Sequence, residues 1–164
     1  MRWLEHIYWT RFVVQDIVFS NPNTDADVQR LLRNPVDFAN ILRPFYGNAI
    51  AMRFKDLFTR HLTIAAELVK AEKAGDNAKA DLERKKWYQN ATEIAEFLSK
   101  INPFWNRAKW QEMLFTHLRL TETEAGQLLA DKYAASIATF EAIQTEAFMM
   151  SDYMFEGIVR QFKL

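Results

Sequence analysis

The sequence predicts an all-α fold: one helical bundle of about six helices, built from repeated helical hairpins and spanning residues 1–164 as a single domain. Apolar residues recur at helical spacing along almost the whole chain, and no stretch of useful length alternates as a strand does. Only four glycines and four prolines interrupt this pattern. Breaks between helices are therefore expected to be few and short.

Local signals set the expected ends of the helices. Thr24, with Asp27 three residues later, forms a capping box that predicts a helix start after the break at residues 20–23. Pro35 lacks a backbone donor and predicts a kink in that helix. A second capping box at residues 121–124 predicts a bend or restart. Helices are expected over about residues 3–19, 24–44, 48–74, 78–101, a stretch after Pro103 that carries residues 110–118, and from 133 nearly to the C-terminus.

The charge composition argues against two classes of partner. The chain has 21 basic and 21 acidic residues, mixed along its length, and a formal net charge of zero. A nucleic-acid-binding surface, or a basic helix lying on a membrane, would need an excess of positive charge. We therefore expect neither nucleic acid nor a membrane as a partner.

No segment has the pattern of an exported or membrane-inserted chain. The most apolar run, residues 12–19, is broken by Gln15 and Asp16 and falls short of the roughly 18–20 residues that a membrane span needs. Charged residues from Arg2 to Arg11 interrupt any signal peptide. The lack of cysteine excludes a disulfide framework and any cysteine-based metal site. The sequence therefore predicts a cytoplasmic protein.

The three histidines of the chain recur at equivalent points of an internal repeat. A shift of 56 residues places Asn34 on Asn90 and His61 on His117 without a gap, and a shift of 55 places His6 on His61. Each histidine precedes an expected turn by 14 residues, which is roughly 21 Å along a helix. If the three hairpins pack side by side, the three imidazoles converge.

Carboxylates on the return helices lie at a comparable level, about 14 to 20 residues past the turns. One of them, Asp152, lies between Phe148 and Phe155 on an apolar face, where a carboxylate is costly unless it is paired or binds a cation. Neutral imidazoles combined with carboxylates suit zinc, iron or manganese. The hypothesis is a metal site in the bundle interior, mononuclear or irregularly dinuclear. Its expected ligands are His6, His61 and His117, followed by Asp152, Glu93 and Asp37.

Other interpretations stay open. The histidines can be hydrogen-bonded core residues of a non-enzymatic interaction or structural module that holds no metal. Such a module would present its aromatic faces and the methionine-rich segment 149–155 to a partner, for example a second copy of the chain in a homodimer. The residues three before the histidines are Trp3, Phe58 and Leu114, so the Glu-x-x-His motif of di-iron bundles is absent. No motif indicates a substrate or a reaction.

Several longer motifs resemble a family of small all-α proteins from spore-forming Gram-positive bacteria. They are Arg30–Pro35, Arg43–Gly47, His61–Ala66, Ile101–Pro103 and Gly157–Phe162, and together they cover essentially the whole chain. The resemblance implies a helical fold but no activity. Members are often labelled acetylglutamate kinase, yet such kinases resemble α/β proteins with glycine-rich phosphate loops, which this chain lacks. From Trp3 onward the chain is also loosely similar to ferritin-like, metal-binding bundles, which favours the metal hypothesis.

Overall fold

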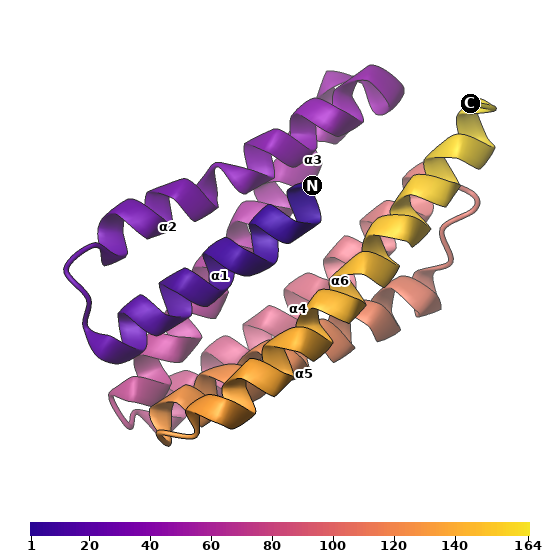
Figure 1. Ribbon diagram of the computed structural model, residues 1–164. Coiled ribbons are helices and arrows are strands. Elements are labelled where there is room, and N and C mark those ends of the chain that lie inside the picture. The colour runs from indigo at the N-terminus through magenta and orange to yellow at the C-terminus, as the bar shows by residue number, and fades with distance from the viewer.

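Helices make up nearly the whole chain, as the apolar spacing predicts, and no strand is present. The computed structural model describes all of residues 1–164 (Figure 1). Its helices are α1 (Arg2–Phe19), α2 (Thr24–Leu32), α3 (Asn34–Lys73), α4 (Asn77–Ile101), α5 (Arg107–Leu129) and α6 (Tyr133–Phe162). None of them is both long and apolar enough to cross a membrane. The predicted all-α bundle is confirmed.

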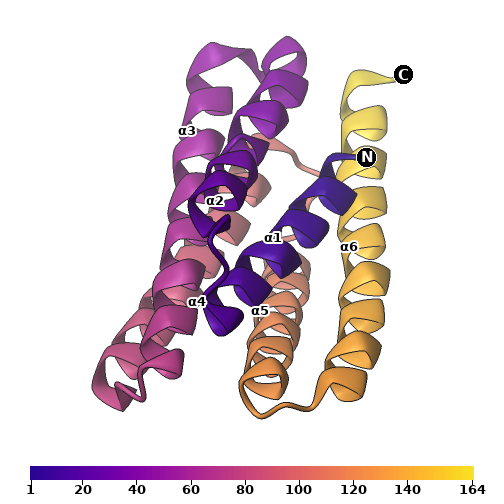
Figure 2. The ribbon, with the colours of Figure 1, turned by 60° about the vertical axis from the view of Figure 1, so that its left-hand side comes forward.

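Three turns, which follow α1, α3 and α5, lie at the same end of the molecule (Figures 1 and 2). Each contains one residue with a positive φ: Ser20 at 56°, Gly75 at 69° and Asp131 at 57°. A left-handed residue at this position ends a helix and turns the chain back. Because the helices leave these turns in a common direction, residues equally far from the turns lie at a similar depth in the bundle.

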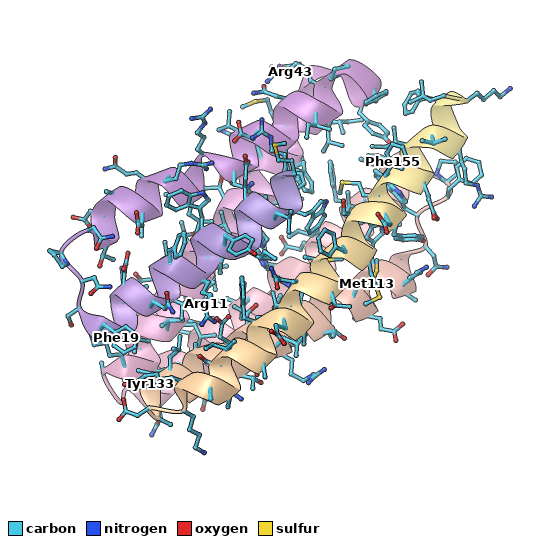
Figure 3. All side chains as sticks on the ribbon, in the orientation of Figure 1. Arg11, Phe19, Arg43, Met113, Tyr133 and Phe155 are labelled. Carbon is cyan, nitrogen blue, oxygen red and sulfur yellow. The ribbon has the colours of Figure 1, made fainter.

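Side-chain contacts hold the turn end together. Lys73 Nζ donates a hydrogen bond of 2.6 Å to the carbonyl oxygen of Ile17. Phe19 packs on Tyr133, both labelled in Figure 3, with ring centroids 6.0 Å apart. The ends of α1 and α3 and the start of α6 are therefore fixed relative to one another.

The opposite end is closed by polar and aromatic contacts. The hydroxyl of Tyr46 accepts a 2.9 Å hydrogen bond from Asn102 Nδ2 and donates one of 2.9 Å to Gln161 Oε1. Gly157 of α6 faces Trp105, and a Cβ at Gly157 would overlap the indole ring. Glycine at this position therefore allows α6 to approach the loop between α4 and α5.

The main core lies between α3, α4, α5 and α6, and α1 packs on α3, α5 and α6 (Figure 1). Trp87, Leu98, Trp110 and Met150 of this core are at most 2% exposed. Because α1 covers the centre of the bundle, its inward face, which includes His6, is in the interior rather than in water.

The break between the second and third helices differs from the expected one. The expected helix over residues 24–44 ends at Leu32, and α3 begins at Asn34. Pro35 falls in the first turn of α3, where its missing N–H would have no helical partner in any case. The proline therefore starts a helix instead of kinking one.

The expected connection at residues 45–47 is reduced to a single irregular residue. Helix α3 continues through Pro44, but Gly47 has φ 80° and ψ 169°, a non-helical conformation that separates two helical segments. A residue without a Cβ tolerates this conformation. The two segments lie alongside each other, because Phe38 packs on Phe54 and Phe58 with ring centroids 5.9 and 5.2 Å apart. The chain therefore reverses at Gly47, and the expected break between these two helices is confirmed (Figures 1 and 2).

Two expected capping boxes are wrong. Helix α5 continues through residues 121–124, because the hydroxyl of Thr121 donates a 2.9 Å hydrogen bond to the carbonyl of His117 within the helix. Asn23, not Thr24, precedes the first turn of α2, and its side-chain amide donates to Asp27 at 2.9 Å.

Candidate metal centre

The three histidines meet in the middle of the bundle. His6 comes from α1, His61 from α3 and His117 from α5, and each is 2–3% exposed. The ring centroid of His6 lies 6.4 Å from that of His61 and 5.5 Å from that of His117. The chain has no other histidine. All of its imidazoles are therefore gathered in one buried cluster, which we call the histidine centre.

The surroundings of the histidine centre are apolar. Phe58 stacks on the His61 ring with centroids 5.9 Å apart, and Trp87 lies 5.4 Å from the same ring. The three rings line a cavity of about 10 Å³ together with aromatic, aliphatic and methionine side chains. A cavity of this size holds a single water-sized particle at most.

Burial keeps at least two of the imidazoles neutral. It lowers the pKa of His6 well below the ordinary 6.5, and the neighbouring His117 and His61 lower it further. The same burial, with His117 close by, lowers the pKa of His61 to about 3. At neutral pH these rings therefore carry an unprotonated nitrogen, the form that binds metal.

The hydrogen bonds of Asn90 fix the tautomer of His61. Asn90 is fully buried on α4, and its Nδ2 donates to the carbonyl of Leu57 at 3.1 Å. Its Oδ1 therefore faces His61 Nδ1, at 3.1 Å, and can only accept. The proton of neutral His61 lies on Nδ1, which leaves a lone pair on Nε2.

His117 has the same arrangement with a carboxylate in place of the amide. Glu146 of α6 is 2% exposed, and its Oε2 lies 3.0 Å from His117 Nδ1. An ionised carboxylate accepts hydrogen bonds only, so His117 donates from Nδ1 and Nε2 is again the second nitrogen. The other carboxylate oxygen, Oε1, is buried without a partner.

In the N-terminal hairpin, Asn34 and His6 are the corresponding pair, but no hydrogen bond joins them. Asn34 is fully buried, and its Nδ2 donates to the carbonyl of Arg2, which is four residues before His6. In the same way, Asn90 donates to the carbonyl of Leu57, which is four residues before His61. Asn34 Oδ1 and His6 Nδ1 are both buried without a hydrogen-bond partner. The two atoms that would form the third equivalent bond are therefore both unsatisfied.

The three carboxylates expected from the sequence do not join the histidines. Asp37 is buried beside Arg2 and Arg33, with closest N–O distances of 3.6 and 3.8 Å. Glu93 forms an ion pair of 3.1 Å with Arg60 near the surface. Asp152 is exposed. None of the three forms a hydrogen bond with a histidine.

Sequence reasoning missed the residues that do contact the imidazoles. His61 and Asn90 are 29 residues apart, and so are His117 and Glu146. The shift of 56 that places Asn34 on Asn90 also places Asn90 on residue 146. Carrying that register into the last hairpin would have selected Glu146 in place of Asp152.

A second buried charge lies near the histidine centre. Glu124 of α5 is 2% exposed and pairs with Arg11 of α1, which is labelled in Figure 3. Burial raises the pKa of Glu124 to about 7, against the opposing effect of Arg11 and of His117. Glu124 already has a cationic partner, so it is satisfied without a metal ion.

In the present side-chain positions, no group of three or more histidine, aspartate or glutamate side chains is arranged to hold a metal ion. Comparison of the chain with known protein families, with curated proteins and with solved structures finds no significant match. The chemistry of the histidine centre is therefore argued from its own atoms.

Proposed function

We propose that this chain is a cytoplasmic metal-binding protein that holds one divalent transition-metal ion through Nε2 of His6, His61 and His117. Glu146 is an outer-shell partner in this proposal, because it contacts His117 at Nδ1. The observation that carries it is the pair of hydrogen bonds at Nδ1 of His61 and His117. Metal-binding histidines generally donate their second ring N–H to a carboxylate or carbonyl oxygen, which aims the free nitrogen at the metal.

Binding requires a small contraction of the cluster. Metal–nitrogen bonds of 2.0–2.1 Å in tetrahedral geometry bring imidazole centroids to roughly 5 Å from one another. The centroid separations of 5.5 and 6.4 Å exceed this by about 1 Å on average. The Nδ1 of His6 is unsatisfied, so no hydrogen bond at this atom holds the ring in its present position.

Zinc, iron and manganese are the candidate ions, since all three accept neutral imidazole with an oxygen ligand. Three protein nitrogens leave one or more coordination positions for water. If water occupies such a position, the metal lowers its pKa and makes it a nucleophile. The residues around the cavity are apolar and indicate no substrate.

The test is elemental analysis of protein purified without chelator or immobilised metal. We expect about one equivalent of metal in the wild type and less than about a tenth in His61→Ala. Leu62→Ala is the matched control, because Leu62 is a buried neighbour whose truncation opens a cavity but removes no donor. Equal metal content in the wild type and in His61→Ala would remove His61 from the site, and a metal-free wild type after incubation with each ion would refute the proposal.

The alternative function is an interaction module in which the histidine centre is structural. The observation that favours it is the row of exposed apolar side chains on α6: Ile137, Phe148, Met149 and Phe155 are 51–65% exposed. A homodimer that packs these faces together would bury them. Light scattering decides this version: we expect a dimer that Phe148→Ser with Phe155→Ser dissociates, and a monomeric wild type excludes it.

We also propose that the three hairpins derive from one duplicated helix-turn-helix unit, as the sequence shifts predict. The three histidines and the residues Asn34, Asn90 and Glu146 hold equivalent places in successive hairpins. In this proposal the metal site lies at the interface of the three copies.

A further inference from the structure

A solvent-open groove runs along α5 and α6 and is strongly acidic. It has a volume of about 450 Å³, and its lining includes four carboxylates and a single cation, Lys109. Three of the carboxylates, those of Glu112, Asp152 and Glu156, belong to exposed residues. The Lys109 ammonium lies 4.2 Å from the ring centroid of Tyr153, at one side of the groove. The formal charge of the lining is −3.

The fourth carboxylate connects the groove with the histidine centre. Glu146 lines the groove although it is 2% exposed. Its Oε2 is bonded to His117 at 3.0 Å, and its Oε1 is buried without any partner. His117 in turn lines the central cavity. One side chain therefore separates an acidic, solvent-open groove from the buried cluster of imidazoles.

Other hollows of similar size lack this connection. One is lined by Asn106, Arg107, Ala108 and Gln111, and another lies at the turn end near Lys70 and Lys73. Neither contains a residue that contacts a histidine, and both carry positive charge. Only the groove with Glu146 combines attraction for a cation with a direct contact to the cluster.

We infer that this groove is the loading route by which a hydrated divalent cation reaches the histidine centre, with Glu146 as the last carboxylate to hold it. The inference rests on the proposed function. The exposed carboxylates raise the local concentration of cations and speed their capture. The ion then exchanges bound water for Glu146 Oε1 and next for the ring nitrogens, with no covalent bond formed or broken in the protein. Met113 and Met149, which also line the groove, are unbranched and can move aside for the ion.

The test is the rate of metal uptake, followed by the visible absorption that Co²⁺ acquires when nitrogen ligands bind it. The variant Glu112→Gln, Asp152→Asn, Glu156→Gln removes three charges from the groove. The matched control Asp25→Asn, Asp56→Asn, Glu141→Gln removes three exposed charges elsewhere. All six residues are exposed, so both variants are expected to fold.

We expect the groove variant to load at least about tenfold more slowly than the control at low ionic strength, with the same final stoichiometry. The difference should shrink at about 0.5 M salt, which screens exposed charges. Equal rates in the groove variant and the control would overturn the loading route while leaving metal binding intact. A wild type that never acquires the Co²⁺ spectrum would instead overturn the proposed function, and the route with it.

Discussion

The His61–Asn90 and His117–Glu146 pairs have the same geometry but different chemistry. In each, a buried imidazole donates from Nδ1 to an oxygen 29 residues further along the chain, at 3.1 and 3.0 Å. We call the Asn90 pair closed, because the second polar atom of Asn90 donates to the carbonyl of Leu57. We call the Glu146 pair open, because the second carboxylate oxygen has no partner and the residue lines an acidic groove.

The difference shows how one residue changes what a buried polar pair can do. An amide satisfies the imidazole and the neighbouring carbonyl at once, so the first pair is complete within the protein. A carboxylate cannot donate to a carbonyl, so the second pair has a free oxygen and a negative charge. The first pair is therefore suited to hold a ring in place, and the second is suited to bind a cation.

The largest effect should come from giving the closed pair the charge of the open one. Asn90→Asp places a carboxylate against the Leu57 carbonyl in a fully buried position, far from the acidic groove. We expect the free energy of unfolding in urea to fall by about 3–5 kcal/mol at neutral pH, as for an uncompensated buried charge. The loss should be smaller near pH 5, where the new carboxyl can take up a proton and donate to Leu57.

The neighbouring substitution Gln89→Glu is the control for Asn90→Asp, because it adds the same charge to an exposed position of α4. It should change the free energy of unfolding by less than about 0.5 kcal/mol. If Asn90→Asp were equally harmless, position 90 would not be a closed polar site.

The reverse change removes the charge from the open pair. Glu146→Gln keeps an oxygen that can accept from His117 but removes the negative charge from this outer-shell partner. We expect metal affinity to fall by about 10- to 100-fold, the usual cost of losing an outer-shell partner. Competition with a chelator of known affinity measures this change. Unchanged affinity would show that Glu146 does not tune the metal site through His117.

Much of the fold could be predicted from the sequence, and the helix boundaries show where such prediction fails. Helical spacing and the turns at Ser20, Gly75 and Asp131 are local properties, and the structure has them. Pro35 predicts a kink, but the local sequence around a proline in the middle of a helix resembles that around one in its first turn. Only the packing of α2 and α3 separates the two cases.

The candidate site was predicted in part for a related reason. The histidine spacing places all three rings at one depth, and the structure brings them together. Asp152 was chosen because it lies between two phenylalanines, but Phe148 and Phe155 are exposed and do not mark a buried face. Glu146 has apolar neighbours at i−3 and i+4, Ile143 and Met150, and both are buried. Its role depends on the pairing of α5 with α6, which periodicity within one helix does not encode.

The pH dependence of stability tests whether burial of His61 suppresses its protonation in the folded chain. Burial lowers the pKa of His61 to about 3 in the folded chain, against 6.5 when exposed. Between these values the unfolded chain binds more protons, so the stability of metal-free protein is lost as the pH falls. His61→Leu should remove a slope of up to about 1.4 kcal/mol per pH unit.

Other groups also titrate in this range. Burial raises the pKa of Glu72 and of Glu124 to about 7, which opposes the effect of the histidines. The measurement is therefore the difference between the wild-type and His61→Leu unfolding curves from pH 7 to pH 4, with chelator present. A difference that does not vary with pH would mean that His61 is protonated as easily inside the protein as outside.

The smallest effect concerns the pair whose bond is missing. Asn90 makes two buried hydrogen bonds, to His61 and Leu57, whereas Asn34 makes only the one to Arg2. In metal-free protein, Asn34→Ala should therefore cost about 1 kcal/mol less in unfolding free energy than Asn90→Ala, the worth of one net hydrogen bond. If metal binding completes the His6–Asn34 hydrogen bond, the two substitutions should then cost the same. A gap that persists with metal bound would mean that this bond does not form when the ion binds.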